Sequence, residues 1–210
     1  MYNPKHFAET DLSRLHAAIE DYSFATLISA SAGGMEASHL PLLLEREAGP
    51  AGTLIGHMAR ANPQWRAAAG NKVLAIFQGP HAYISPSWYE AEQVVPTWNY
   101  VAIHAYGTLN PIEDLREVRH IVARTVRKYE SSREHPWPFD EEAEYFRRLL
   151  PQIVAFRVPL DRLEGKWKLN QNHPQPRRQL VIQALSSSPH ETDLQVAALM
   201  KESLPASELG

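Results

Sequence analysis

Residues that could bind an anion gather in one short segment of the sequence. His57 lies near the end of the run 53–58, which has the length and composition of a strand, and Arg60 and Asn62 follow this run. The turn that ends a strand exposes backbone N–H groups, and an arginine adds a planar set of donors that matches a phosphate. A lone Arg60 is more often a surface cation, so only the cluster as a whole predicts a phosphate site.

A second group of residues could hold a flat ring. Thr97, Trp98 and Asn99 continue an aromatic region that begins at 83–89. Aromatic side chains beside hydroxyl and amide groups form a wall for a heteroaromatic ring, and they equally form a core or an interface. These residues therefore leave a ligand site, a core and an interface open.

Two further segments mix polar residues with a strand pattern. Ser38 and His39 precede Pro41, and because proline cannot donate a ladder hydrogen bond, this strand lies at a sheet edge or faces a ligand. Near the other end of the chain, Trp167 lies between two lysines and is followed by amides. That arrangement could clamp a phosphate and cover a ring, form a solvated strand, or contact nucleic acid.

The elements that must position these residues are mostly short. Apolar spacing predicts a first helix over 12–22 and a hairpin around Gly33-Gly34, and Gly79-Pro80 predicts a turn. Strands do not alternate regularly with helices, so we expect an α+β protein built on an antiparallel barrel. The other expected elements are strands at 53–58, 73–77, 82–85, 101–109, 153–158 and 163–169 and helices at 112–129, 140–150 and 192–204.

Composition and missing motifs exclude several classes of protein. The 210 residues carry a formal net charge of -3 and no cysteine, which argues against bulk polycationic binding of nucleic acid and excludes disulfides and thiolate metal sites. The sequence has no dinucleotide-binding or phosphate-loop glycine motif and no serine nucleophile elbow. With no leader-like or spanning stretch, we expect a cytoplasmic protein.

Together the motifs resemble the PaiB family of FMN-binding negative transcriptional regulators. They occur in the family's order over nearly the whole chain, and one position departs from the pattern, Asn170, where we expect serine. The matching segments are Met1-Tyr2-Asn3-Pro4-Lys5-His6-Phe7, Ser38-His39-Leu40-Pro41, 56–63, 83–89, Pro96-Thr97-Trp98-Asn99-Tyr100 and Lys168-Leu169-Asn170-Gln171-Asn172.

The resemblance implies an antiparallel split β-barrel with flanking helices, similar to the pyridoxamine-phosphate oxidase superfamily. It implies a homodimer with FMN sites between the subunits, a barrel domain over residues 1–180 and a C-terminal helical extension over 181–210. The cofactor residues that it implies are Ser38, His39, His57, Arg60, Asn62, Thr97, Trp98, Asn99, Trp167, Lys168 and Gln171. No catalytic residue follows from it, although His57 and Tyr100 are candidates for a base.

Four functions remain open at this point. The first is an FMN-dependent regulator or redox sensor, and the second is a flavin-dependent oxidoreductase that acts on a small molecule. A third is a haem-binding split barrel that uses His39, His57 or His104. A fourth is direct binding to DNA through a local patch of Lys166, Arg177 and Arg178.

Overall fold

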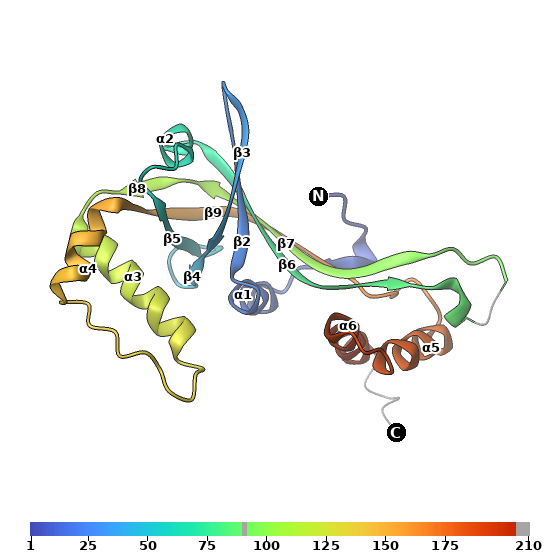
Figure 1. Cartoon of the computed structure of the whole chain (residues 1–210). Coiled ribbons are helices and arrows are strands. Elements are labelled where there is room, and N and C mark those ends of the chain that lie inside the picture. The colour runs from blue at the N-terminus through green and yellow to red at the C-terminus, as the bar shows by residue number, and fades with distance from the viewer. Residues whose placement is uncertain (90–91, 205–210) are drawn as a thin grey trace. The chain divides into compact units, whose positions relative to one another are not determined.

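The computed structural model describes residues 1–89 and 92–204 of the chain (Figure 1). Its helices are α1 (Leu12–Asp21), α2 (Gln64–Ala68), α3 (Leu115–Glu130), α4 (Glu144–Leu149), α5 (Gln175–Ser186) and α6 (Glu191–Glu202), with short 3-10 turns at Lys5–Phe7, Pro86–Tyr89 and Leu150–Gln152. Its strands are β1 (Ala8–Glu9), β2 (Phe24–Ser31), β3 (Gly34–Pro41), β4 (Leu43–Glu45), β5 (Thr53–Ala59), β6 (Lys72–Ile84), β7 (Thr97–Thr108), β8 (Asn110–Ile112) and β9 (Ile153–Lys168).

The described strands form an open sheet in the order β3-β2-β6-β7-β9-β5-β4, and β1 and β8 pair with β9. The pairings whose register is defined are all antiparallel. The β2–β3 hairpin turns between Ser31 and Gly34, as the Gly-Gly motif predicts. An open antiparallel sheet with helices beside it agrees with the expected α+β class.

The chain divides into two compact units, and β6, β7 and β9 contribute residues to both of them. Unit 1 comprises Met1–Asp11, Gln78–Ile103 and Glu164–Gly210, of which the structure leaves 90–91 and 205–210 undescribed. Unit 2 comprises Leu12–Phe77 and His104–Leu163. The expected end of the barrel domain, residue 180, lies inside α5. The division into 1–180 and 181–210 stays a prediction, and residues 205–210 lie outside the described ones.

Unit 2 is organised around an apolar core under α3 and α4. Val118 and Ile121 of α3 and Phe146 of α4 pack on Ile55 of β5 and Ala155 of β9. This apolar stripe is the one that the sequence predicts, but α3 begins at Leu115, where Asp114 accepts a hydrogen bond from the Arg116 backbone N–H. Ile112, predicted to lie in this helix, belongs to β8 instead because the Asp114 cap sets the start of the helix.

The long strands of unit 2 approach each other closely. A Cβ on Gly107 of β7 would lie 2.3 Å from the carbonyl oxygen of Pro159 in β9, a separation that no side chain tolerates. Glycine at this position therefore allows the two backbones to meet.

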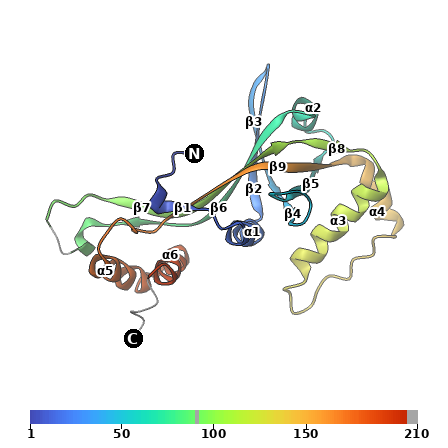
Figure 2. The same cartoon turned by 180° about the vertical axis from the view of Figure 1, so that it is seen from behind.

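Unit 1 carries the last two helices. α5 and α6 lie side by side in both views (Figure 1 and Figure 2), and Val181, Leu185, Val196 and Met200 are buried there. The sequence predicts α6 but not α5, because Pro174 and Pro176 predict a break in regular structure. The two prolines lie instead at the start of α5, where the first backbone N–H groups have no helical partner and proline is tolerated.

Two strand predictions were wrong in the same way. Gly79-Pro80 does not turn; it lies within the continuous strand β6, and both residues are buried. Likewise 153–158 and 163–169 form one strand, β9, that includes Pro159 and ends at Lys168. Proline lacks a backbone N–H, but it fixes φ at a value that extended backbone accepts, so strand pairing overrides its turn preference. The predicted helix at 140–150 is also shorter, because Asp140 caps a turn and α4 begins only at Glu144.

Candidate functional site

Five of the predicted cofactor residues belong to unit 2 and six to unit 1, so each group is described within its own unit. In unit 2, Asn62 connects the turn after β5 to the edge strand β3. Its Nδ2 donates to Ser38 Oγ at 2.9 Å, and its Oδ1 accepts from the Gln64 backbone N–H at 2.9 Å. Because Ser38 Oγ accepts this bond, its own hydroxyl proton remains available for a ligand.

The guanidinium of Arg60 is held by two main-chain carbonyls, one in the 3-10 turn Leu150–Gln152 and one at the start of β9. Its Nε donates to Pro151 O at 2.6 Å and its Nη2 donates to Ile153 O at 2.9 Å. Of the five N–H groups of an arginine, three have no acceptor among the described residues. Arg60 is therefore a fixed cation with donors to spare, which is the chemistry a phosphate site requires.

The two histidines of this region are in different environments. His57 is half-buried on β5, and burial lowers its pKa, so the ring is neutral at neutral pH. Its Nδ1 is buried and has no hydrogen-bond partner in residues 1–89 or 92–204. His39 is exposed on β3, with Nδ1 3.1 Å from Thr26 Oγ1. Among His57, Arg60 and Asn62, which form the predicted phosphate site, Arg60 therefore supplies the positive charge.

In unit 1, the structure brings Lys168 together with Thr97 and Trp98. Lys168 Nζ donates to Thr97 Oγ1 and to the carbonyl oxygen of Trp98, the latter at 2.6 Å. Burial and then the charge of Lys166 lower the pKa of Lys168. Lys168 makes no ion pair with any described carboxylate.

The remaining three predicted residues serve the local structure. Asn99 is fully buried, and its Nδ2 contacts Met200 Sδ at 3.3 Å. Gln171 closes the turn after β9, because its Nε2 donates to Trp167 O at 2.6 Å and its Oε1 accepts from Leu169 N at 2.7 Å. Contact between Asn99 and a cofactor would require a rearrangement of unit 1, and the cofactor roles of these residues stay predictions.

Unit 1 contains a cavity of about 290 Å³ that the sequence does not predict, and Lys168 and Thr97 form part of its wall. Its other polar groups include Asn170, His173 and Arg177, from the turn after β9 and the first turn of α5. His173 stacks on Tyr89 with ring centroids 5.0 Å apart, and Asn170 Nδ2 donates to the Tyr89 hydroxyl at 3.0 Å. His173 follows directly after the Lys168–Asn172 motif, so its position in the sequence could have indicated that it belongs to the same site.

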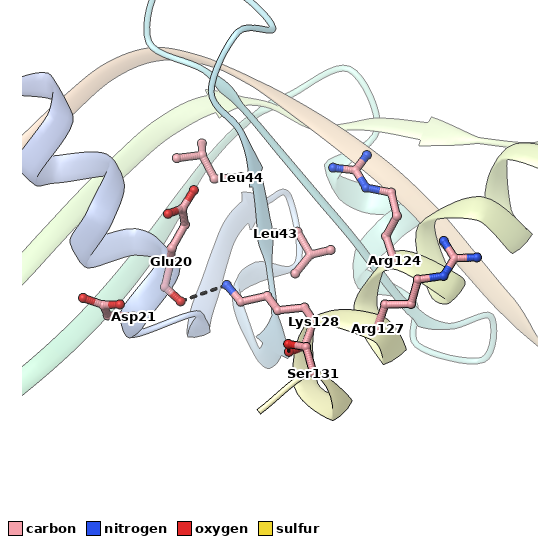
Figure 3. A pocket seen from close by; sticks show the side chains of 8 residues that line it. All are labelled: Glu20, Asp21, Leu43, Leu44, Arg124, Arg127, Lys128 and Ser131. Atoms are coloured by element: carbon pink, nitrogen blue, oxygen red, sulfur yellow. Dashed lines mark hydrogen bonds between the residues drawn. The ribbon is translucent and has the colours of Figure 1, made fainter. Parts of the chain in front are cut away.

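A wider and more open cavity lies in unit 2, between α1, β4 and α3 (Figure 3). Three basic side chains of α3 line it, but each has a protein partner. Lys128 Nζ donates to Glu20 O at 2.8 Å, Arg127 pairs with Glu141 at 2.7 Å, and Arg124 pairs with Glu45. None of the eleven predicted cofactor residues lines this cavity, so it offers no support for the predicted site.

Comparison with known sequences identifies the family to which these segments belong. The family model described as "Putative FMN-binding domain" matches residues 1–162. The chain is 35% identical over 206 residues to "Protease synthase and sporulation protein PAI 2" of Bacillus subtilis, which covers 97% of this chain and 98% of that protein. The match thus extends over both units.

Comparison with solved structures identifies the fold. The FAD and haem binding protein from Mycobacterium smegmatis superposes with a TM-score of 0.58 at 15% identity, covering 77% of this chain and 73% of that chain. The flavocytochrome Anf3 from Azotobacter vinelandii gives a TM-score of 0.57 at 10% identity, covering 77% and 69%. The fold of this chain is therefore the flavin-binding split barrel, as the resemblance implies. None of the described helices is long and apolar enough to cross a membrane.

Proposed function

Because this chain belongs to the PaiB family of FMN-binding proteins, we propose that it is a negative transcriptional regulator that responds to the presence or redox state of FMN. FMN is the cofactor of the family. When bound, it supplies hydride or single-electron transfer at its ring. The name of the Bacillus subtilis relative refers to protease synthesis and sporulation, which are cellular processes and not a chemical reaction, and this supports a regulatory role.

The observation that carries FMN binding is the anchored guanidinium of Arg60. Three free N–H groups of Arg60 and the hydroxyl proton of Ser38 form a donor set that fits a phosphate. The neutral ring of His57 adds hydrogen-bonding capacity without charge, and its buried Nδ1 lacks a protein partner. We assign the phosphate of FMN to this turn, with β3 as the flanking strand.

Fluorescence titration of FMN against two arginine variants tests this assignment. Arg60→Ala is expected to weaken FMN binding about tenfold or more, because charged hydrogen bonds to the phosphate are lost. Arg66→Ala is the matched control, because this substitution removes the same charge from the same region. Arg66 is exposed, and its guanidinium lies 4.4 Å from the centroid of the Trp65 ring. Equal affinities for Arg60→Ala and the wild type would place the phosphate elsewhere.

A flavin-dependent oxidoreductase is the second candidate. The names of the structural neighbours, a flavocytochrome and a FAD and haem binding protein, favour it because they describe redox proteins. Oxidation of NADH or NADPH by the FMN-loaded protein separates the two functions: rapid turnover supports the enzyme, and tight FMN binding without turnover supports the regulator. An absorption spectrum of the purified protein tests haem binding in the same preparation, since a Soret band would indicate haem.

The regulator proposal includes a homodimer with flavin sites between the subunits. Sedimentation of the protein with and without FMN tests the dimer. Direct DNA contact is tested by a mobility shift at two salt concentrations, because binding to phosphates weakens as salt rises. Lys166 and Arg178 are buried in this structure, with Lys166 donating to Tyr2 O and Arg178 to Ser203, so DNA contact would depend on other cations.

A further inference from the structure

The cavity of unit 1 combines a basic wall with an apolar wall. The basic wall is formed by Lys168, Arg177 and His173, and Phe7, Val94 and Val95 contribute apolar surface. At about 290 Å³, the cavity lies just below the usual range for ligand sites, which begins at about 300 Å³. Its size and its two kinds of wall suit a small molecule with one charged end.

The charge of the cavity has no counterpart among the described residues. No described aspartate or glutamate lines the cavity, and neither Lys168 nor Arg177 makes an ion pair within residues 1–89 and 92–204. Glu92 is near in sequence, but it is exposed and does not line the cavity. Burial first, and then the charges of Arg177 and Lys168, lower the pKa of His173. A bound anion would relieve the repulsion between these groups.

The backbone around the cavity is also unusual. Gln93, with φ 58°, and Asn170, with φ 62°, both line it, and they are the two non-glycine residues with positive φ in the described chain. Side-chain-bearing residues in this conformation cost free energy and concentrate at ligand-binding sites. The Asn170 conformation is stabilised by the bond from its Nδ2 to the Tyr89 hydroxyl.

One donor, the ammonium of Lys168, lies close to the apolar wall. Lys168 Nζ is held by Thr97 Oγ1 and Trp98 O, and it lies 5.9 Å from the centroid of the Phe7 ring. The ammonium therefore stands where the basic wall meets the apolar wall. An anionic group at this position would place the rest of a small molecule against Phe7.

We propose that the cavity of unit 1 binds a small organic anion, with a carboxylate or phosphate group held by Lys168 and Arg177 and a compact apolar part against Phe7. This site is additional to the Arg60 turn, to which the phosphate of FMN is assigned. Its ligand would be a substrate or an effector that the flavin protein recognises by this chemistry.

Calorimetric titration of the FMN-loaded full chain tests the proposal, with benzoate, phenyl phosphate and inorganic phosphate as probes. We expect benzoate or phenyl phosphate to bind more tightly than inorganic phosphate, because only the former two also use the apolar wall. Arg177→Gln is expected to weaken the organic anion about tenfold, as the loss of a charged hydrogen bond implies. Lys201→Gln, an exposed charge change on α6 in the same unit, is the matched control and is expected to bind like the wild type.

A second variant guards against a folding defect in Arg177→Gln. Asn172 is exposed and lines the cavity, so Asn172→Asp adds a carboxylate without changing the side-chain shape. It is expected to abolish binding of the organic anion by like-charge repulsion while leaving the circular dichroism spectrum unchanged.

Three results would overturn the proposal. The first is no binding of any probe to the wild type at millimolar concentration. The second is equal weakening by Arg177→Gln and Lys201→Gln, which would indicate bulk charge only. The third is a parallel loss of FMN affinity in Arg177→Gln, which would assign the cavity to the flavin; because Arg60→Ala tests the flavin phosphate separately, failure of one assignment is distinguishable from failure of the other.

Discussion

The cavities of unit 1 and unit 2 are both lined by lysine and arginine side chains, but these groups have different partners. In unit 2, Arg124 and Arg127 pair with glutamates and Lys128 donates to a main-chain carbonyl. In unit 1, Lys168 and Arg177 pair with no described carboxylate. A basic residue whose charge is balanced within the protein contributes to stability, whereas an unbalanced one is available to bind an anion. The contrast distinguishes a structural charge cluster from a candidate ligand site.

The largest expected effect is the loss of the glutamate at the centre of the unit 2 network. Glu45 is half-buried and pairs with both Arg124 and Arg157, and Arg157 Nε also donates to Glu117 at 2.9 Å. Glu45→Ala leaves two arginines without this partner, and we expect it to lower the free energy of unfolding by about 2 kcal/mol. Urea denaturation measures the loss. The exposed Glu47→Ala is the control and should change stability by less than about 0.5 kcal/mol.

The same glutamate predicts a pH dependence of stability. Burial alone would raise the pKa of Glu45, but the hydrogen bond from Arg124 and the charges of Arg157 and Arg124 outweigh it, so the pKa lies below its usual value of 4.5. The stabilisation is therefore complete above pH 4.5 and is lost as the pH falls through the lowered pKa. Urea denaturation at neutral pH and at about pH 3 measures how far the free energy of unfolding falls on acidification. We expect this fall to be smaller for Glu45→Ala than for the wild type. Identical losses in the two proteins would contradict this account.

A smaller effect is expected from the wall of the unit 1 cavity. Tyr89→Phe removes the acceptor of Asn170 Nδ2, and because both residues are buried, the amide is left without a partner. We expect a loss of about 1.5 kcal/mol in urea denaturation. We also expect weaker binding of the organic-anion probe, since Asn170 lines the cavity. Wild-type stability together with wild-type binding would show that this hydrogen bond does not maintain the cavity.

The smallest effect on stability is expected from a basic residue that has no carboxylate partner. Lys168→Met removes hydrogen bonds to Thr97 and Trp98, but it also removes the cost of burying a charge next to Lys166. We expect the free energy of unfolding to change by less than about 1 kcal/mol. If Lys168→Met lowered the free energy of unfolding as much as Glu45→Ala does, the contrast between the two cavities would be contradicted.

Local sequence patterns predicted much of the fold. The spacing of Leu15 and Ile19 predicts α1, and Gly33-Gly34 predicts the β2–β3 hairpin, since helical periodicity and tight turns are local properties. Where proline predicts an interruption, the prediction is wrong: β6 continues through Pro80, and α5 begins among prolines. A proline interrupts a strand or helix only where its missing N–H would have donated a hydrogen bond within the sheet or helix. The tertiary structure decides at which positions such a bond is needed.

In the candidate site, too, some features follow from the local sequence and others depend on the tertiary structure. The sequence by itself determined the family, the split-barrel class and the segments in which Arg60, Ser38 and Lys168 occur. Only the tertiary structure decided the partners of each charge, because those partners are distant along the chain. Glu45 lies 112 residues from Arg157, and Thr97 lies 71 residues from Lys168. Charge balance is a property of position in space, so a basic residue in the sequence becomes a structural cation or a ligand-binding one only when the chain has folded.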